Sequence, residues 1–121
     1  MITREQFMMG RDTAYPTTEE MEVNAAKLLY RVNGLLKAIG SPLTTEVTSG
    51  YRPGIFNANY APGSAHLTCR AIDLADANGA LKAKVTEELL AKFNLWAEEY
   101  ARTKTWIHLQ IRPASQRIFK V

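Results

Sequence analysis

The chain has 121 residues, of which 46% are hydrophobic and 22% charged, values typical of a soluble globular protein with one domain. Its formal net charge is +3, but the Lys and Arg residues are scattered, which argues against a nucleic-acid-binding protein. The single cysteine, Cys69, excludes an intrachain disulfide and a cysteine-rich zinc knuckle. We therefore expect one domain over residues 1–121, without nucleic acid as a partner.

The sequence contains no apolar run with the length of a signal peptide or of a membrane span. Its first segment, "MITREQFMMGRD", already carries charges at Arg4 and Glu5. We expect synthesis in the cytoplasm without a signal peptide, and no membrane partner.

Two helices are predicted in the first third of the chain. Thr3 and Gln6 form a capping box that predicts a short helix near the start. Thr17 and Glu20 predict a second capping box, which begins a long amphipathic helix that ends at Gly40. The apolar stripe of this helix is predicted to be core and consists of Ala25, Leu28, Leu29, Val32, Leu35, Leu36 and Ile39.

The rest of the chain predicts strands with one helix between them. The segments "TEVTSGYRP" and "RAIDLAD" predict strands, and "ALKAKVTEELLAKFNLW" predicts one amphipathic helix. "TWIHLQI" and "QRIFKV" predict two further strands, joined by a turn around Pro113. This order predicts an α+β fold with a small, largely antiparallel sheet packed against helices.

Two of the predicted strands, "TWIHLQI" and the strand that contains "AIDLA", carry polar side chains on one face. In "TWIHLQI", alternation places His108 and Gln110 opposite the apolar residues, and in "AIDLA" it places Asp73 among small alanines. A carboxylate in such surroundings is costly unless it is paired or bound to a metal. With His66, the other histidine of the chain, these residues offer a His₂Asp set that suits Zn²⁺ on the sheet face.

Simpler interpretations of the same residues exist. Asp73 could pair with Arg70 or cap the loop near Asn78, and a histidine on a strand is often only structural. Spacing alone leaves these alternatives open.

Three segments together resemble the zinc-dependent peptidoglycan peptidases of the M15 family. "SAHLTCRAIDL" resembles the family signature Ser-x-His-x-x-Gly-x-Ala-x-Asp, "TSGYRP" its Ser-Gly-Tyr-Arg strand, and "WIHLQ" its Trp-x-His segment. The family includes D-alanyl-D-alanine dipeptidases and carboxypeptidases and the L-alanyl-D-glutamate endopeptidases of phage endolysins. The chain looks most similar to short phage and prophage members.

The resemblance implies a role for five residues. His66, Asp73 and His108 would be the zinc ligands. Ser64 would support the site or the substrate through hydrogen bonds. Arg52 would stabilise the developing oxyanion and orient the substrate, which suits a fixed guanidinium group.

The chain departs from the family pattern at two positions. Cys69 replaces the usual glycine, and we interpret it as a packing residue rather than a fourth ligand. Thr105 stands where many members carry a catalytic Glu or Asp, and threonine is no general base. Glu98 and Glu99 are the best substitutes, although both could equally be solvated charges at a helix end. Gln110 is expected to bind the substrate peptide or to orient water.

The resemblance therefore implies a monomeric enzyme that hydrolyses an amide bond in peptidoglycan stem peptides with Zn²⁺ as cofactor. It would remain in the cytoplasm of the host cell until its release to the cell wall, or travel in the virion. The alternative is a non-catalytic, zinc-stabilised wall-binding or virion component with the same fold, which Thr105 favours.

Overall fold

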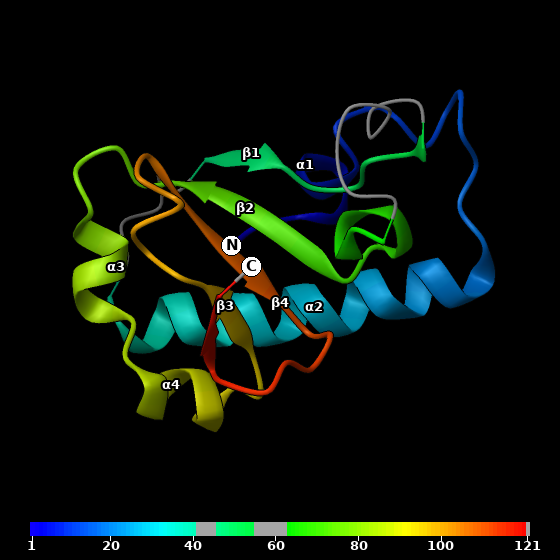
Figure 1. Ribbon diagram of the computed structural model, residues 1–121. Helices are drawn as coiled ribbons and strands as arrows, with labels where there is room; N and C mark the ends of the chain where they lie inside the picture. Colours follow the sequence, from blue (N-terminus) through cyan, green and yellow to red (C-terminus); the bar gives the residue numbers. More distant parts are fainter. Residues whose placement is uncertain (41–45, 55–62, 121) are drawn as a thin grey trace.

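The computed structural model describes residues 1–40, 46–54 and 63–120 (Figure 1). Two helices come first and the strands follow, as the sequence predicts, with helical segments between some of them. The elements are α1 (Arg4–Met8), α2 (Glu19–Ala38), β1 (Val47–Ser49), the 3₁₀ helix η2 (Ala65–Thr68), β2 (Ala71–Ala75), α3 (Ala80–Lys84), α4 (Glu87–Lys92), β3 (Trp96–Glu98), β4 (Trp106–Gln110) and β5 (Ile118–Phe119).

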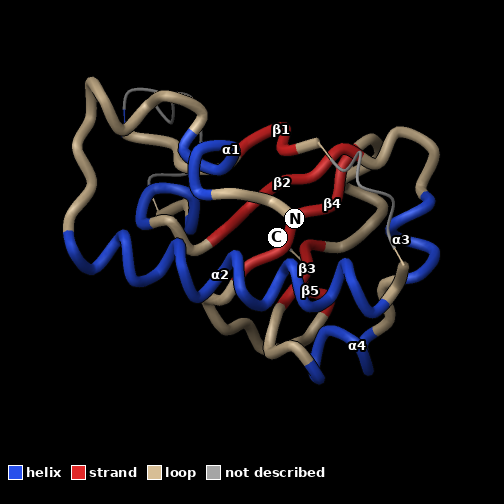
Figure 2. Tube along the Cα trace, turned by 180° about the vertical axis from the view of Figure 1, so that it is seen from behind, coloured by secondary structure: helices blue, strands red, loops and turns tan. Residues whose placement is uncertain are grey.

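The five strands form one sheet in the order β1-β2-β4-β3-β5. All neighbouring strands are antiparallel except β3 and β5, which run parallel. Helix α2 lies across one face of the sheet (Figures 1 and 2). The predicted α+β fold with a largely antiparallel sheet is confirmed.

The core lies between α2 and this sheet. The predicted stripe is buried along α2, with Leu28, Val32 and Leu35 fully inaccessible, while its last member, Ile39, is half-buried at the C-cap. On β4, Ile107 and Leu109 are buried in the same cluster, as alternation predicts. The polar residues of β2 and β4 are therefore turned to the face of the sheet that α2 does not cover.

One of the two predicted capping boxes lies at the predicted residues, and the other is shifted by one residue. The box at α1 is confirmed, since the amide of Gln6 donates to the hydroxyl of Thr3 at 3.2 Å. The box at α2 lies one residue later than predicted, because the cap is Thr18, which accepts a bond from the amide of Met21. The hydroxyl of Thr17 instead donates to the carboxylate of Glu22.

The helix predicted for "ALKAKVTEELLAKFNLW" is wrong, because this segment forms α3, α4 and the start of β3. Val85 has extended backbone angles (φ −85°, ψ 103°) and ends α3. The side chain of Thr86 then accepts a bond from the amide of Leu89 and begins a new helix. Asn94 adopts a positive φ of 54°, which turns the chain into β3, so Trp96 belongs to a strand.

The last predicted strand forms, but it does not lie beside β4. Strand β3 separates them, and β5 pairs with it through Ala97–Ile118 and Glu98–Phe119. The amide of Ala97 donates to the carbonyl of Arg117 at 2.8 Å. The turn after β4 therefore carries the chain past one strand before it rejoins the sheet.

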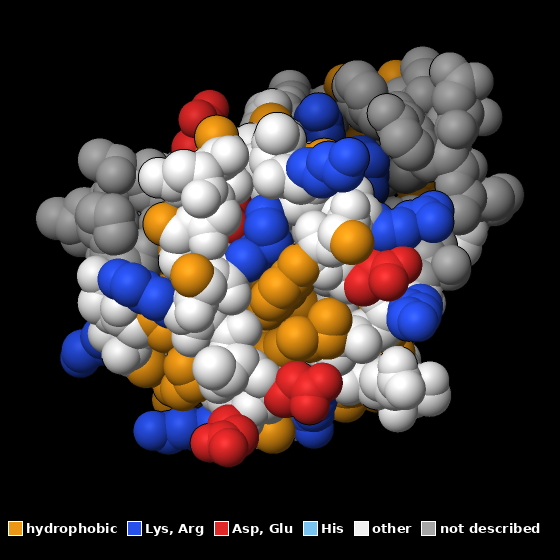
Figure 3. All heavy atoms as spheres, turned by 60° about the vertical axis from the view of Figure 1, so that its left-hand side comes forward, with side chains coloured by type: hydrophobic (Ala, Val, Ile, Leu, Met, Phe, Trp, Pro, Cys, Tyr) orange, Lys and Arg blue, Asp and Glu red, His pale blue; other side chains and the backbone are white. Residues whose placement is uncertain are grey.

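None of the described helices combines the length and the apolar character of a membrane span. On the face shown in Figure 3, basic and acidic side chains both lie around a central group of hydrophobic side chains. That face is therefore not a uniformly charged surface.

Candidate metal centre

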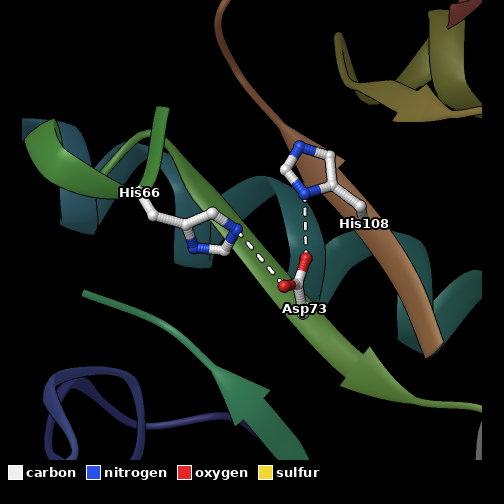
Figure 4. Close-up of side chains that lie close together, drawn as sticks. All are labelled: His66, Asp73 and His108. Carbon is white, nitrogen blue, oxygen red and sulfur yellow. Dashed lines mark hydrogen bonds and ion pairs between the residues drawn. The ribbon is translucent and has the colours of Figure 1, made fainter. Parts of the chain in front are cut away.

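Three predicted metal ligands meet on the face of the sheet that α2 leaves uncovered (Figure 4). Asp73 on β2 and His108 on β4 are direct cross-strand partners. His66 comes from η2, the turn that immediately precedes β2. The possible ligand atoms of the three side chains all lie within 4.8 Å of one another.

Asp73 lies between the two imidazole rings. Its Oδ1 is 2.8 Å from Nδ1 of His108, and its Oδ2 is 3.3 Å from Nε2 of His66. The alternative that Asp73 pairs with Arg70 is wrong, because the Nε of that arginine donates to the hydroxyl of Thr68.

The carboxylate that caps the loop near Asn78 is Asp76. It accepts hydrogen bonds from the backbone amides of Leu81 at 2.8 Å and Lys82 at 3.0 Å. The alternative that Asp73 caps this loop is therefore also wrong, and Asp73 is available to the two histidines.

The tautomer of His66 follows from its surroundings. Its Nδ1 lies 2.8 Å from the carbonyl oxygen of Gly50, which can only accept, so Nδ1 carries the proton. The residue is 1% exposed, and this burial lowers its pKa despite the opposing effect of Asp73. His66 is therefore neutral at neutral pH, and its Nε2 presents a lone pair.

The lone pair on Nε2 of His66 is the feature of the site that best fits a metal ion. The buried Nε2 of His66 has no hydrogen-bond partner among the described residues, and it faces a carboxylate oxygen of Asp73. Two acceptors that face each other in a buried site are unfavourable unless a cation lies between them. A set of two imidazoles and one carboxylate suits zinc with a fourth position left open.

The contact between Asp73 and His108 favours the charged form of each side chain. Burial raises the pKa of Asp73, but its interactions with His108 and His66 outweigh this effect and leave the pKa below its ordinary value. Burial lowers the pKa of His108, but the bond to Asp73 and the neighbouring charges raise it overall. Asp73 is therefore ionised throughout the physiological pH range, as a metal ligand must be.

Gly50 supports His66 in a way that the prediction missed. A Cβ atom at this position would lie 2.0 Å from the carbonyl oxygen of Phe7 in α1. That carbonyl also accepts a bond from the amide of Tyr51 at 3.0 Å. The glycine of "SGYRP" therefore lets α1 pack against the segment whose carbonyl holds the imidazole, and its presence in the motif was the available signal.

Cys69 occupies a position that explains the family's glycine. Its φ is +60°, in the left-handed region where glycine is favoured. The thiol is fully buried in the core cluster, and burial raises its pKa to about 12. These properties agree with packing rather than metal binding.

A cavity of about 410 Å³ opens over the three ligands. Of the other predicted site residues, it is lined by Arg52, Ser64, Glu98 and Gln110. The cavity therefore collects side chains from β3, β4 and the segments that follow β1 and precede η2.

The two candidate bases have different surroundings. Glu98 lies on β3 and lines the cavity, whereas Glu99 is not among the described residues that line it. The backbone amide of Glu99 donates to the carbonyl of Phe119. Since α4 ends at Lys92, neither glutamate lies at a helix end, and that part of the alternative is wrong; both side chains are half-buried.

Three further residues hold the ligands in place. The hydroxyl of Ser64 accepts a bond from the amide of His66 at 3.3 Å and so caps η2. The amide of Arg52 donates to the carbonyl of His66 at 3.2 Å. Gln110 has its Oε1 2.7 Å from Nε2 of His108, the ring nitrogen that does not face Asp73.

Thr105 is exposed in the turn just before β4, and its carbonyl accepts a bond from the amide of Asp76. It offers no carboxylate to the cavity, so any general base has to come from another element.

Comparison with known families gives one match: the model of the family described as Peptidase M15 covers residues 2–110. No curated protein and no solved structure matched the chain.

Proposed function

The chain belongs to the peptidase M15 family, and from this premise we propose that it hydrolyses an amide bond in peptidoglycan stem peptides with zinc as cofactor. The observation that carries the proposal is the convergence of His66, Asp73 and His108 below a cavity that also contains Glu98 and Arg52. Such a cavity holds the ligands for a Lewis acid, a carboxylate and a guanidinium group together.

His66, Asp73 and His108 would hold the zinc ion. When bound by three protein ligands, zinc supplies Lewis acidity, which polarises a carbonyl group and makes water more acidic. The single negative charge of Asp73 leaves the site with a net positive charge once zinc binds, which preserves this acidity.

We assign Glu98 as the general base. Its strand is antiparallel to β4, and Glu98 lines the same cavity as His108 and Asp73. A carboxylate in this position can accept the proton of the attacking water and deliver it to the leaving amine. Glu98 would thus do from β3 what the acid at the position of Thr105 does in many family members.

Arg52 is the proposed electrophilic partner. Its backbone amide donates to the carbonyl of His66, and Arg52 lines the cavity beside the proposed ligands. A guanidinium group here would stabilise the negative charge that develops on the carbonyl oxygen during attack.

The test is incubation of the purified protein with purified peptidoglycan, followed by mass analysis of the soluble fragments. Release of stem-peptide products by the wild type, and its loss in a folded His66→Ala variant, are the expected results. The products identify the bond that is cut, and so distinguish a D,D-carboxypeptidase from an L-alanyl-D-glutamate endopeptidase.

The second candidate is a non-catalytic, zinc-stabilised wall-binding component, which the threonine at position 105 favours. It predicts zinc binding and sedimentation with peptidoglycan without any fragments. A role in phage or prophage lysis, with a monomeric protein that is released from the cytoplasm or carried in a virion, belongs to the same proposal and rests on the sequence resemblance.

A further inference from the structure

Gln110 is a buried amide with both of its polar groups engaged. The residue is 3% exposed and lies two positions after His108 on β4. Its Nε2 donates to the carbonyl oxygen of Arg112 at 2.7 Å, and its Oε1 lies 2.7 Å from Nε2 of His108. Both contacts have ordinary hydrogen-bond lengths.

The carbonyl of Arg112 fixes the orientation of this amide. Because a carbonyl oxygen can only accept, the group of Gln110 that faces it is the NH₂ group. The oxygen of Gln110 therefore faces His108, and Nε2 of that ring carries the proton. Nδ1 donates to the ionised carboxylate of Asp73, so it also carries a proton here (Figure 4). Because Gln110 holds the proton on Nε2, Nδ1 is the ring nitrogen whose proton a metal ion can replace.

The opposite arrangement holds at His66. There Nδ1 donates to the carbonyl oxygen of Gly50, and Nε2 faces Asp73. The proton that each imidazole would keep on binding a metal is thus held at opposite nitrogens, by a backbone carbonyl in His66 and by a side-chain amide in His108.

We infer that Gln110 is a positioning residue that selects Nδ1 of His108 as the metal-binding atom, an inference that rests on the zinc site of the proposed function. Gln110 acts through the imidazole rather than on the substrate, in contrast to the substrate-binding role expected from the sequence. Partners of this kind orient ligating histidines, and their loss typically lowers metal affinity about 10- to 100-fold.

The first test compares zinc affinity in the wild type, Gln110→Leu and Gln110→Glu by competition with a chromophoric chelator. Both variants lose the bond to the carbonyl of Arg112, but only Gln110→Glu keeps an oxygen that faces Nε2 of His108. We expect zinc affinity to fall about 10- to 100-fold in Gln110→Leu and to stay within a few fold of the wild type in Gln110→Glu. Circular dichroism of the zinc-free variants checks that both are folded.

The second test reads the tautomers directly. The chain has only two histidines, so long-range proton–nitrogen NMR spectra of the zinc-loaded protein contain two imidazole patterns. We expect one ring protonated at Nδ1 and the other at Nε2, and the His66→Ala variant identifies which pattern belongs to His108.

Either of two results overturns the inference: a Gln110→Leu variant that binds zinc as tightly as the wild type, or two rings with the same tautomer. Failure of the proposed function is recognised separately. A wild-type protein that takes up no zinc would contradict both the proposed function and the role of Gln110. A wild-type protein that binds zinc with the expected tautomers but never cleaves peptidoglycan would contradict the proposed function alone.

Discussion

Glu98 and Phe119 are register partners on the parallel strands β3 and β5. The ring of Phe119 also lies edge-on to His108, with 6.0 Å between the ring centroids, and it lines the cavity. The C-terminal strand thus supports the proposed base and one proposed ligand together, although it lies beyond residues 2–110, which the family model covers.

Replacing Glu98 tests the assignment of the base. We expect Glu98→Gln to lower kcat on peptidoglycan by about 10²- to 10⁴-fold, because an amide cannot accept the proton of water. Zinc affinity should be unchanged, since Glu98 is not one of the ligands. Glu99→Gln is the matched control and should retain wild-type activity. Equal losses in the two variants would contradict the assignment.

Zinc removal should destabilise the protein. A ligand that binds only the folded state at 100 times its Kd adds about 2.7 kcal/mol to the free energy of unfolding. We expect a chelator to lower Tm of the wild type, and Asp73→Asn to abolish the difference between zinc-loaded and zinc-free samples. Glu46→Gln, at an exposed acid beside β1, should keep it. Thermal unfolding followed by circular dichroism measures all three.

Gly50→Ala should be strongly destabilising. The new Cβ would meet the carbonyl oxygen of Phe7 at 2.0 Å, and backbone cannot move aside as a flexible side chain can. We expect a loss of about 3 kcal/mol, at the upper end for overpacking, together with weaker zinc binding as the support of His66 shifts. Gly54→Ala, where a Cβ meets nothing within 4 Å, should change the free energy of unfolding by less than about 0.5 kcal/mol. Urea unfolding that finds the two variants alike would count against this role for Gly50.

The positive φ of Cys69 makes this position sensitive to side-chain shape rather than size. Cys69→Gly relieves about 1 kcal/mol of backbone strain while it loses a small buried group, so the net change should stay within about 1 kcal/mol. Cys69→Val places a β-branched residue in the left-handed region and should lose more stability than Cys69→Gly. Urea unfolding of the two variants gives the order, and the reverse order would contradict the expectation.

The same thiol should give stability a dependence on alkaline pH. Burial raises the pKa of Cys69 from an ordinary value of 9.0 to about 12, so folding favours the neutral thiol. This contribution is complete below the pKa of the unfolded chain and is lost progressively as the pH rises from about 9 toward 12. We expect the stability of the wild type relative to Cys69→Ala to decrease between pH 8 and pH 10.5. A constant difference would show that the thiol does not titrate in this way.

Local patterns predicted the face of the sheet that carries the site. Alternation along β2 and β4 is a property of any strand, so it placed Asp73, His108 and Gln110 on one side before any pairing was known. The same logic predicted the buried stripe of α2, because helical periodicity needs only the local sequence.

Other features depend on helix caps and long-range contacts, which the spacing of apolar residues does not reveal. Apolar residues keep a helical spacing across Val85 and Thr86, yet the cap at Thr86 interrupts the helix. Consequently, Glu98 was expected in a loop before β4, whereas it lies on a strand beside it. The contact between Gly50 and His66 joins residues 16 positions apart, and no local pattern reports which ring nitrogen such a carbonyl will meet.

The register between β2 and β4 also determines where this protein can tolerate insertions. One residue added within either strand would move every following side chain to the opposite face, and Asp73 or His108 would then point into the core. A residue added to the connection between them, over residues 76–105, would leave the pairing of these two strands intact. Variation in chain length should therefore be tolerated in the turns of this connection and be excluded from the two five-residue strands.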